Sequence, residues 1–239
     1  MSNSRRDLLR HLELAAEAYG LDLPLAAAKE IPAPAAPAPA ARAAPAITLE
    51  ALRAEVLQCT KCKLCHGRTQ AVFGEGNPQA RVLFVGEAPG QTEDATGRPF
   101  VGRAGQLLTK IIENAMGLQR ADVYIANINK CRPPENRVPA PDEVAACLPY
   151  LRAQIQLITP AVIVALGKTA ASNLLGETRA VSTLRGEQLE FAGTPVVVTW
   201  HPAYLLRNPA AKVDTWEDIK RVNRLLGLPE VPRQGAAGS

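Results

Sequence analysis

Four short apolar runs that alternate with segments of helical periodicity constrain the fold of this chain more than any other feature. A strand that is apolar at consecutive positions is buried on both faces, as in a parallel sheet covered by helices. The pattern therefore predicts an α/β fold in which helices pack on both faces of a parallel sheet. The runs cover residues 81–86, 123–128, 161–166 and 195–200, and helices are expected over 104–116, 141–158 (beginning at Pro141 and Asp142), 169–175 and 215–226.

The regions on either side of this α/β body differ from it in composition. Residues 1–23 carry leucine and alanine at spacings that form one apolar face of a helix, whereas residues 24–46 are mostly alanine and proline. Because an Ala-Pro run neither sustains a helix nor forms a core, we interpret it as an exposed, semi-rigid linker. The sequence thus predicts an amphipathic helical extension (1–23), a linker (24–46), one folded domain (47–228) and a disordered tail rich in proline, glycine and alanine (229–239).

Composition restricts the class of protein only in part. A chain of 239 residues with a net charge of +4 holds one sizeable domain and suits a polyanionic partner without identifying one. No stretch reaches the roughly 18 to 20 apolar residues of a membrane span. The polar start Met1–Asp7 lacks the apolar core of a signal peptide, so we expect a cytoplasmic protein that does not enter a membrane. In that reducing compartment, the five cysteines indicate a metal site rather than disulfides.

Polar residues follow three of the four predicted strands. Glu87 follows the first run, Asn127 lies at the end of the second, and His201 follows the fourth. Ligands of open α/β sheets bind beyond the carboxyl ends of the strands, so these side chains are expected at one edge. An amide pairs with the polar edge of a base, an imidazole stabilises an oxyanion on a departing ring, and a carboxylate holds water or an incipient cation. A base-excising enzyme needs these groups, but a small-molecule hydrolase or three merely solvated loop residues would show the same pattern.

One aromatic ring lies in the loop Thr96–Gly102, which is otherwise rich in turn residues. Phe100 is one of only four phenylalanines in the chain, and a ring in such a loop can stack on an extruded base. The alternative is that the ring packs the loop onto the sheet. Spacing alone supports both interpretations.

Four of the five cysteines form a set that suits a tetrahedral metal site. Cys59 and Cys62 are separated by two residues just before the sheet, and Cys131 and Cys147 lie far downstream. Zinc and an iron–sulfur cluster both accept a near pair with two distant ligands. Cys65 extends the near pair, but the fourth cysteine and proline of a bacterial ferredoxin motif do not follow, so we interpret Cys65 as a bystander. Basic residues near the proposed ligands either form a solvated face or bind phosphates: Lys61, Lys63, His66, Arg68, Lys130, Arg132 and Arg137.

Four longer motifs make the chain similar to a known enzyme family. They are Gly86–Asp94, Thr96–Leu108, Asn127–Arg137 and His201–Pro209, which occur in family order and with family-like spacing. On these motifs the sequence resembles the family 4 uracil-DNA glycosylases, the iron–sulfur branch of the uracil-DNA glycosylase superfamily. The resemblance implies a DNA repair enzyme that flips uracil out of DNA and hydrolyses its N-glycosidic bond. Free uracil is released and an abasic site remains, which is the first step in base excision repair of deaminated cytosine.

The resemblance also implies a fold, a cofactor and partners. The fold is a three-layer α/β/α arrangement with a central four-stranded parallel sheet. The cofactor is a 4Fe-4S cluster on Cys59, Cys62, Cys131 and Cys147, with a structural role away from the reacting base. The expected partner is uracil-containing DNA, double- or single-stranded, and we expect the protein to be a monomer.

Roles around the base follow from the same resemblance. Asn127 would recognise the polar edge of uracil, Phe100 would stack on its ring, and His201 would bind the oxygen that gains charge as the bond breaks. Glu87 lies in the water-positioning motif. Glu93 would stand near uracil C5 and help to reject the methyl group of thymine.

Ala88 marks a departure from the wider superfamily, whose best-known members have an aspartate at this position. The small residue fits family 4 and would line the substrate site. The weak water activation that it leaves suffices for a dissociative reaction, in which an oxocarbenium-like sugar captures water. The group that activates this water is not fixed by the sequence.

Contacts with DNA are implied by two of the motifs. One resembles the loop whose side chains fill the gap left by a flipped nucleotide, and the other carries polar residues beside the cysteines. The candidate DNA-binding residues are Leu205, Leu206, Arg207, Arg132 and Asn136.

The resemblance does not extend to residues 1–46, which we interpret as a tethered docking helix for a repair or replication protein. Two rival functions remain at this stage. A zinc-binding nucleic-acid module explains the cysteines and the charge but not the polar residues at the strand ends. A small-molecule hydrolase needs a nucleophile or metal-bound water, but the sequence shows neither a Gly-x-Ser-x-Gly elbow nor a His/Asp metal cluster.

Overall fold

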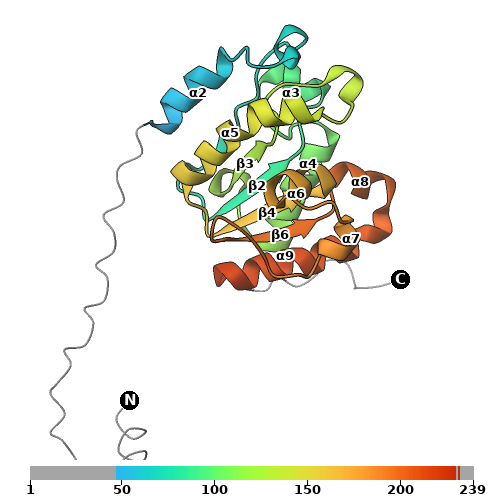
Figure 1. Cartoon of the computed structure of the whole chain (residues 1–239). Helices are drawn as coiled ribbons and strands as arrows, with labels where there is room; N and C mark the ends of the chain where they lie inside the picture. The colour runs from blue at the N-terminus through green and yellow to red at the C-terminus, as the bar shows by residue number, and fades with distance from the viewer. Residues whose placement is uncertain (1–46, 230, 232–239) are drawn as a thin grey trace, which may run out of the picture. The chain divides into compact units, whose positions relative to one another are not determined.

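The computed structural model describes residues 47–229 and 231. The helix predicted in residues 1–23 and the linker predicted in 24–46 lie outside the described residues, as does the predicted tail apart from Pro229 and Val231. Figure 1 shows the order of the elements from α2 to α9. No helix in residues 47–229 is long and apolar enough to cross a membrane.

The sheet has six strands in the order β1-β3-β2-β4-β6-β5. Its four central strands are parallel and match the four apolar runs to within one residue at each end. The predicted four-stranded parallel sheet is therefore confirmed as the centre of a wider one, because a short antiparallel strand pairs at each edge. The central strands are β3 (Tyr124–Asn127), β2 (Val82–Gly86), β4 (Val162–Leu166) and β6 (Thr194–Thr199), and the edge strands are β1 (Glu75–Gly76) and β5 (Leu189–Phe191).

The two edge strands carry no continuous apolar run, which is why the sequence pattern did not reveal them. β1 has only two residues, and β5 is partly exposed. β5 and β6 form a hairpin whose turn residues, Ala192 and Gly193, both have positive φ (49° and 79°). Two such residues in succession are the mark of a tight hairpin turn.

The four predicted helices are present. The helix over 141–158 has the predicted bounds and begins with proline, while two others begin two and three residues earlier than expected. The helix predicted over 104–116 continues beyond Ile111 as one turn of π-helix, Ile112–Met116. The helices are α4 (Arg103–Ile111), α5 (Pro141–Ile158), α6 (Gly167–Leu175) and α9 (Lys212–Leu226). Shorter helices not predicted are α2 (Leu49–Leu57), α3 (Gln91–Thr96), α7 (Val181–Leu184) and α8 (Pro202–Arg207), with 3-10 turns at Lys63–His66, Arg120–Asp122, Pro134–Asn136 and Pro209–Ala211.

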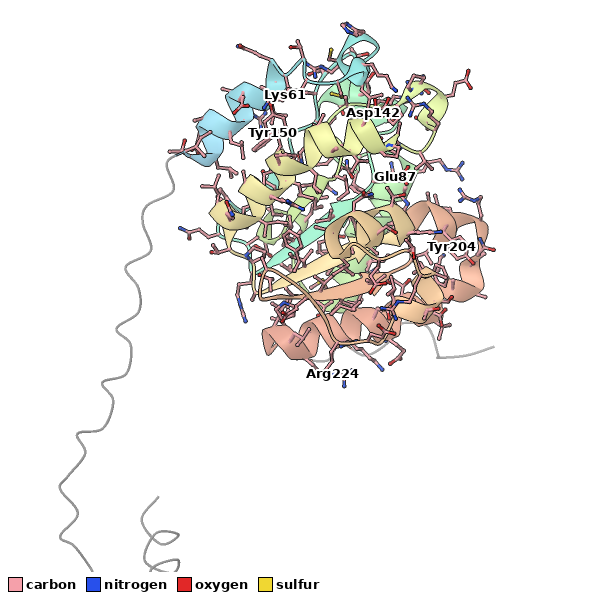
Figure 2. All side chains as sticks on the ribbon, in the orientation of Figure 1. Lys61, Glu87, Asp142, Tyr150, Tyr204 and Arg224 are labelled. Carbon is pink, nitrogen blue, oxygen red and sulfur yellow. The ribbon has the colours of Figure 1, made fainter. Side chains whose placement is uncertain are left out.

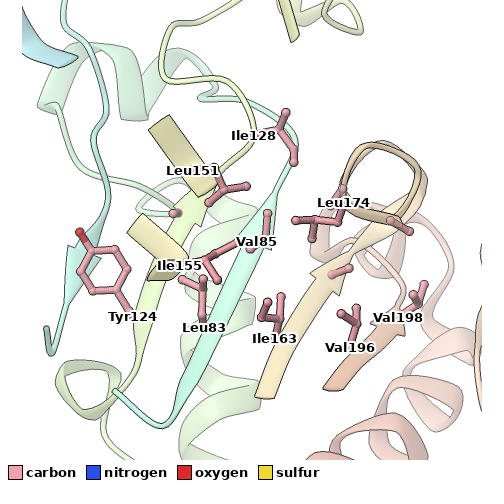
Figure 3. Packing of buried hydrophobic residues seen from close by; sticks show 14 of the residues in the cluster. Leu83, Val85, Tyr124, Ile128, Leu151, Ile155, Ile163, Leu174, Val196 and Val198 are labelled. Carbon is pink, nitrogen blue, oxygen red and sulfur yellow. The ribbon is translucent and has the colours of Figure 1, made fainter. Parts of the chain in front are cut away.

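Alternate side chains of the central strands enter two separate cores, which confirms the three-layer α/β/α fold. On one face, Leu83, Val85 and Ile163 pack with α5, α6 and α7. Figure 3 shows these three side chains beside Leu151 of α5 and Leu174 of α6. On the other face, Val82 and Phe84 pack with α4, the π-turn and α9. Figure 1 shows α5 and α6 in front of the sheet and α9 below it. Each fully buried aliphatic side chain stabilises the fold by about 1.5–3 kcal/mol, so the two cores hold the ends of the central strands in place.

A third, smaller core joins α2 to α5 in the cysteine region. Leu52, Val56 and Phe73 are buried here against Cys147 and Tyr150. The Tyr150 hydroxyl donates to Glu55 Oε1 at 3.0 Å, and the ammonium of Lys61 lies 4.5 Å from the centre of the Tyr150 ring (Figure 2). These contacts fix the segment that carries the first cysteines against the helix that carries the last.

Candidate active site and cysteine centre

The carboxyl ends of the parallel strands bring the predicted polar residues to one edge of the sheet. Gly86 at the end of β2 pairs with Asn127 at the end of β3, and the pairing continues as Asn129 N donates to Glu87 O at 3.0 Å. β6 ends at Thr199, two residues before His201. Glu87, Asn127 and His201 therefore leave the sheet on the same side, as the sequence predicted.

Asn127 and Phe100 meet directly over Gly86. A Cβ atom on residue 86 would lie 2.4 Å from Asn127 Oδ1 and 2.5 Å from Phe100 Cζ. Asn127 is only 2% exposed, and its Oδ1 has no hydrogen-bond partner among the described residues. A buried acceptor left unpaired costs about 1–3 kcal/mol. Such an atom at a strand end marks a place where a ligand donor fits.

The loop that carries Phe100 is held in a strained shape. Phe100 has φ +50°, a left-handed conformation that is uncommon for a bulky residue. Glu93 Oε1 accepts the N–H groups of Val101 and Gly102 at 2.9 and 2.8 Å. A Cβ atom on Gly105 would lie 1.9 Å from the Phe100 carbonyl carbon, so α4 begins directly against this backbone. The ring is 7% exposed and belongs to the core under α4, so it packs the loop onto the sheet as well as bordering Asn127.

His201 begins α8 and faces Phe100. Its Nδ1 accepts the N–H of Ala203 at 3.1 Å, so the proton of the neutral ring is on Nε2, which remains available as a donor. The His201 and Phe100 ring centroids are 5.6 Å apart. The rings of Trp200 and Tyr204 stack with centroids 4.6 Å apart and brace the same turn.

The surroundings of His201 keep it neutral. Burial, with a smaller contribution from the charge of Arg207, lowers its pKa to about 4, against an opposing influence of Glu93. A Cβ atom on Gly167 would lie 2.9 Å from the His201 Cβ, so the start of α6 closes on the ring from the β4 side. At neutral pH the side chain is an uncharged donor in a tightly packed place.

Glu87 contacts a residue that the sequence analysis did not select. The hydroxyl of Thr169, in the first turn of α6, donates a hydrogen bond to Glu87 Oε2. Thr169 follows the end of β4, the one strand end whose polar residues were not considered. Its position shortly after the end of β4, like that of Glu87 after β2, was the signal that could have identified it. Ala88, the next residue after Glu87, is partly buried.

The candidate DNA-binding residues lie on α8 and on the loop after β3. In α8, Leu205 is fully buried, whereas Leu206 is 41% exposed and Arg207 is exposed. Of the three residues predicted to fill the gap left by a flipped nucleotide, the structure therefore favours Leu206 and Arg207, since Leu205 belongs to the core. After β3, Arg132 Nε donates to Asn136 Oδ1 at 2.8 Å, which joins the two predicted residues of this loop.

The five cysteines line one cavity. Cys59, Cys62 and Cys65 are half-buried and come from the end of α2 and the turn after it, whereas Cys131 and Cys147 are buried and come from the β3 end and α5. Cys65, interpreted as a bystander, borders the same cavity as the four proposed ligands. Within the part of the chain that the structure describes, no group of three or more Cys, His, Asp or Glu residues is arranged to hold a single metal ion.

Similarity to known proteins bears on the identity of the chain. Residues 73–222 match the sequence model of the Uracil DNA glycosylase superfamily. The chain belongs to this superfamily. Its similarity is strong to a type-4 uracil-DNA glycosylase of Thermotoga maritima, with 47% identity over 182 residues, covering 74% of this chain and 94% of the relative. A type-4 enzyme of Sulfurisphaera tokodaii is 44% identical over 77% of this chain and 87% of its own length, and one of Saccharolobus solfataricus is 44% identical over 74% and 86%.

The donors in the cysteine cavity fit the iron–sulfur cluster implied by the type-4 resemblance. Arg68 Nη1 donates to Cys131 Sγ at 3.0 Å, and the backbone N–H of Lys130 donates to Cys147 Sγ at 3.2 Å. Such donors are found around the thiolates of cluster sites, where they tune the metal centre. Without metal, burial raises the pKa of Cys131, and raises that of Cys147 to about 11. A bound cation reverses this preference and deprotonates the thiol.

Lys130 is a further residue at the site whose place the sequence did not reveal. Lys130 was noted only as one of several basic residues, but it is 1% exposed and hydrogen-bonded to Asn127 O and Gln154 Oε1 at 2.8 and 2.6 Å. Burial lowers the pKa of Lys130 to about 8, and the charge of Cys147 opposes that shift. Its position between a strand-end asparagine and a cysteine was the available signal.

Proposed function

We propose that the place bordered by Asn127, Phe100 and His201 receives a uracil extruded from DNA. The observation that carries the proposal is the buried, unpartnered Oδ1 of Asn127, packed beside an aromatic ring over Gly86. The chain is a uracil-DNA glycosylase, a hydrolase of N-glycosyl bonds that acts in DNA repair. The base would stack on Phe100 while its polar edge pairs with the amide of Asn127.

The bond cleavage that we infer is dissociative. The bond between sugar C1′ and uracil N1 breaks, its electron pair leaves with the base, and water then adds to C1′ and loses a proton. Neutral His201 would donate its Nε2–H to the uracil oxygen on which negative charge develops, which stabilises the transition state more than the ground state. Glu87, oriented by Thr169, would hold the water or stabilise the sugar cation.

Ala88 and Glu93 would complete the substrate site. A small side chain at residue 88 leaves room for the base and its water. Glu93 is already bound to two amides of the Phe100 loop, so it would shape the stacking surface as well as exclude the methyl group of thymine. Both tasks need a carboxylate close to the Phe100 loop, and Glu93 meets this need because α3 lies directly before that loop.

Four cysteines are proposed to hold a 4Fe-4S cluster: Cys59, Cys62, Cys131 and Cys147. When bound, the cluster would tie the end of α2 and α5 to the loop after β3, which is a structural role. Leu206, Arg207, Arg132 and Asn136 are proposed to contact DNA, with Leu206 or Arg207 filling the space of the flipped nucleotide. The proposed substrate is uracil-containing DNA, double- or single-stranded, and we propose that the protein acts as a cytoplasmic monomer.

We also propose that residues 47–228 form the catalytic domain and residues 1–46 a tethered docking segment. Deleting residues 1–46 should leave excision from short oligonucleotides unchanged and should abolish capture of a repair or replication protein in a pull-down. The comparison is between the full chain and the truncated chain at equal concentration. Equal capture by both would remove the docking role.

Gly86→Ala should disable the site without unfolding the sheet. The added methyl group would occupy the space beside Asn127 Oδ1 and the Phe100 ring, so we expect single-turnover excision to fall at least about 100-fold. Gly176→Ala, at the end of α6, is the control, because its added methyl group meets no atom within 4 Å although the left-handed backbone is strained. Equal loss of activity in both variants would mean that destabilisation, not crowding, is the cause.

The pKa of His201 predicts a dependence of stability on pH. In the folded state it lies near 4 rather than 6.5, so the unfolded chain binds this proton first as the pH falls. The free energy of unfolding should therefore decrease between about pH 6.5 and 4, by up to about 3 kcal/mol. Urea unfolding at pH 7 and pH 5 should show a smaller loss for His201→Gln than for the parent protein. Identical losses would contradict the lowered pKa.

The proposed function is tested on oligonucleotides that carry one uracil, thymine or cytosine, opposite guanine, opposite adenine or single-stranded. We expect alkali to cleave the strand at uracil after incubation with the protein and to leave the thymine and cytosine strands intact. Hypoxanthine serves as a further candidate base. Absence of alkali-sensitive sites in every uracil context would overturn the proposal.

A further inference from the structure

Lys130 is a buried lysine that the proposed mechanism does not use. It is 1% exposed, and the acceptors of its ammonium group are two neutral oxygens, the carbonyl of Asn127 at 2.8 Å and Gln154 Oε1 at 2.6 Å. Placing an ammonium group in a protein interior is costly unless its hydrogen bonds are made. A residue held there at such cost is a candidate for more than packing.

The carbonyl that Lys130 binds is one that the sheet leaves unpaired. Ile128 N donates to Gly86 O, so residue 128 turns its backbone groups toward β2. The backbone groups of Asn127 therefore face the opposite side, where Ile125 pairs with Glu75 of β1. β1 begins at Glu75, opposite Ile125, so it does not reach the position opposite Asn127. Among the described residues no strand lies beside Asn127 on this side, and the Lys130 ammonium supplies the donor that a strand would have given.

Hydrogen bonds also hold the backbone of Lys130 and the side chain of its acceptor Gln154. Its backbone N–H donates to Cys147 Sγ at 3.2 Å, and its carbonyl accepts the N–H of Val72 at 2.7 Å. Gln154, which is fully buried in α5, also donates from Nε2 to the carbonyl of Phe73 at 2.9 Å. The ammonium thus has a rigid anchor in α5 and the loop before β1.

We propose that Lys130 is a positioning residue that, together with Gln154, holds the backbone of Asn127 so that its amide meets the polar edge of the base. The inference rests on the proposed function, because it assigns Asn127 to base recognition. The amide has little freedom, since Gly86 and Phe100 leave it no other space. Displacement of a positioned group by a fraction of an ångström slows catalysis strongly.

The test is a double-mutant cycle on single-turnover uracil excision. Lys130→Met keeps the length and burial of the side chain but removes its donors. We expect the excision rate to fall to about one tenth of the parent rate or below. Because Lys130 acts through Asn127, the double variant Lys130→Met/Asn127→Ala should be no slower than Asn127→Ala alone. Lys130→Met should retain the iron content and the absorbance at about 400 nm of the parent protein. Lys220→Met, a change on α9 at a half-buried lysine that pairs with Glu217, is the control and should match the parent.

A second pair of variants keeps the test decisive if Lys130→Met does not fold. Gln154→Leu removes the acceptor for the ammonium and should resemble the loss expected for Lys130→Met. Gln154→Glu retains that acceptor and gives up only the bond to the Phe73 carbonyl, so it should lose less activity than Gln154→Leu. Rate losses that add in the double variant, equal rates for both Gln154 variants, or loss of the absorbance together with activity would each overturn the inference. A parent protein that excises no uracil would instead overturn the proposed function, and this inference with it.

Discussion

Replacing Asn127 with alanine is expected to lower single-turnover uracil excision by about 10³-fold, the largest effect of any change in the base site. The amide is 2% exposed, and its Oδ1 has no partner among the described residues, so a bound base would supply the hydrogen bond that this oxygen lacks. Alanine removes both the acceptor and the donor while leaving β3 intact. Rates should be measured with enzyme in excess, so that product release does not mask the chemical step.

Asn223→Ala is the matched control for this prediction. Asn223 is also buried, donates from Nδ2 to Ala115 O at 2.8 Å, and has an Oδ1 without a partner among the described residues, but it lies on α9. Replacing Asn223 should lower the free energy of unfolding, because the Ala115 carbonyl loses its donor. The excision rate should stay within about threefold of the parent rate. If both variants lost activity equally, Asn127 would have no special place in the reaction.

The second large effect is expected at the cysteine centre. Cys147→Ser is nearly isosteric and buried, so a change in behaviour reports on metal binding rather than on packing. We expect loss of the absorbance at about 400 nm, loss of iron, and a thermal midpoint lower by about 10 °C, since the cluster joins α2 and α5. Iron and acid-labile sulfide should be determined on protein purified without oxygen.

Cys65→Ser separates a ligand from a neighbour. Cys65 borders the same cavity but is interpreted as a bystander, so this variant should keep the parent absorbance and iron content. A colourless parent protein that contains one zinc ion would contradict the iron–sulfur assignment. Loss of the absorbance in Cys65→Ser and its retention in Cys147→Ser would exchange the two cysteines in the ligand set.

The fold could be predicted where hydrophobic pattern and burial coincide. β2, β3 and β4 are buried at every position and appear in the sequence as continuous apolar runs, and α5 begins at the predicted proline. β1 and β5 could not be found this way, because two or three partly exposed residues leave no periodic signal. Their pairing is decided by the neighbouring strand, which is a tertiary effect.

The site was predictable to the extent that it lies at strand ends. The sequence indicated Asn127, Glu87 and His201 because each follows an apolar run, and the structure places them on one edge. Thr169 and Lys130 were missed for different reasons. Thr169 follows a strand whose end was not considered, and Lys130 acts through contacts with α5 that depend on three-dimensional packing. Leu205 was predicted together with Leu206 and Arg207, and the structure shows that it is buried, because a motif does not distinguish the buried side of α8 from its exposed side.

The most direct test of the account is the joint measurement of free uracil and abasic sites in single turnovers. An oligonucleotide with one labelled uracil is incubated with the full chain, the base is separated by chromatography, and the strand is analysed before and after alkali. The account predicts one free uracil for each alkali-sensitive site, an intact strand before alkali, and neither product with Asn127→Ala on the same time scale. Strand breaks without alkali, or abasic sites formed equally well by Asn127→Ala, would contradict it.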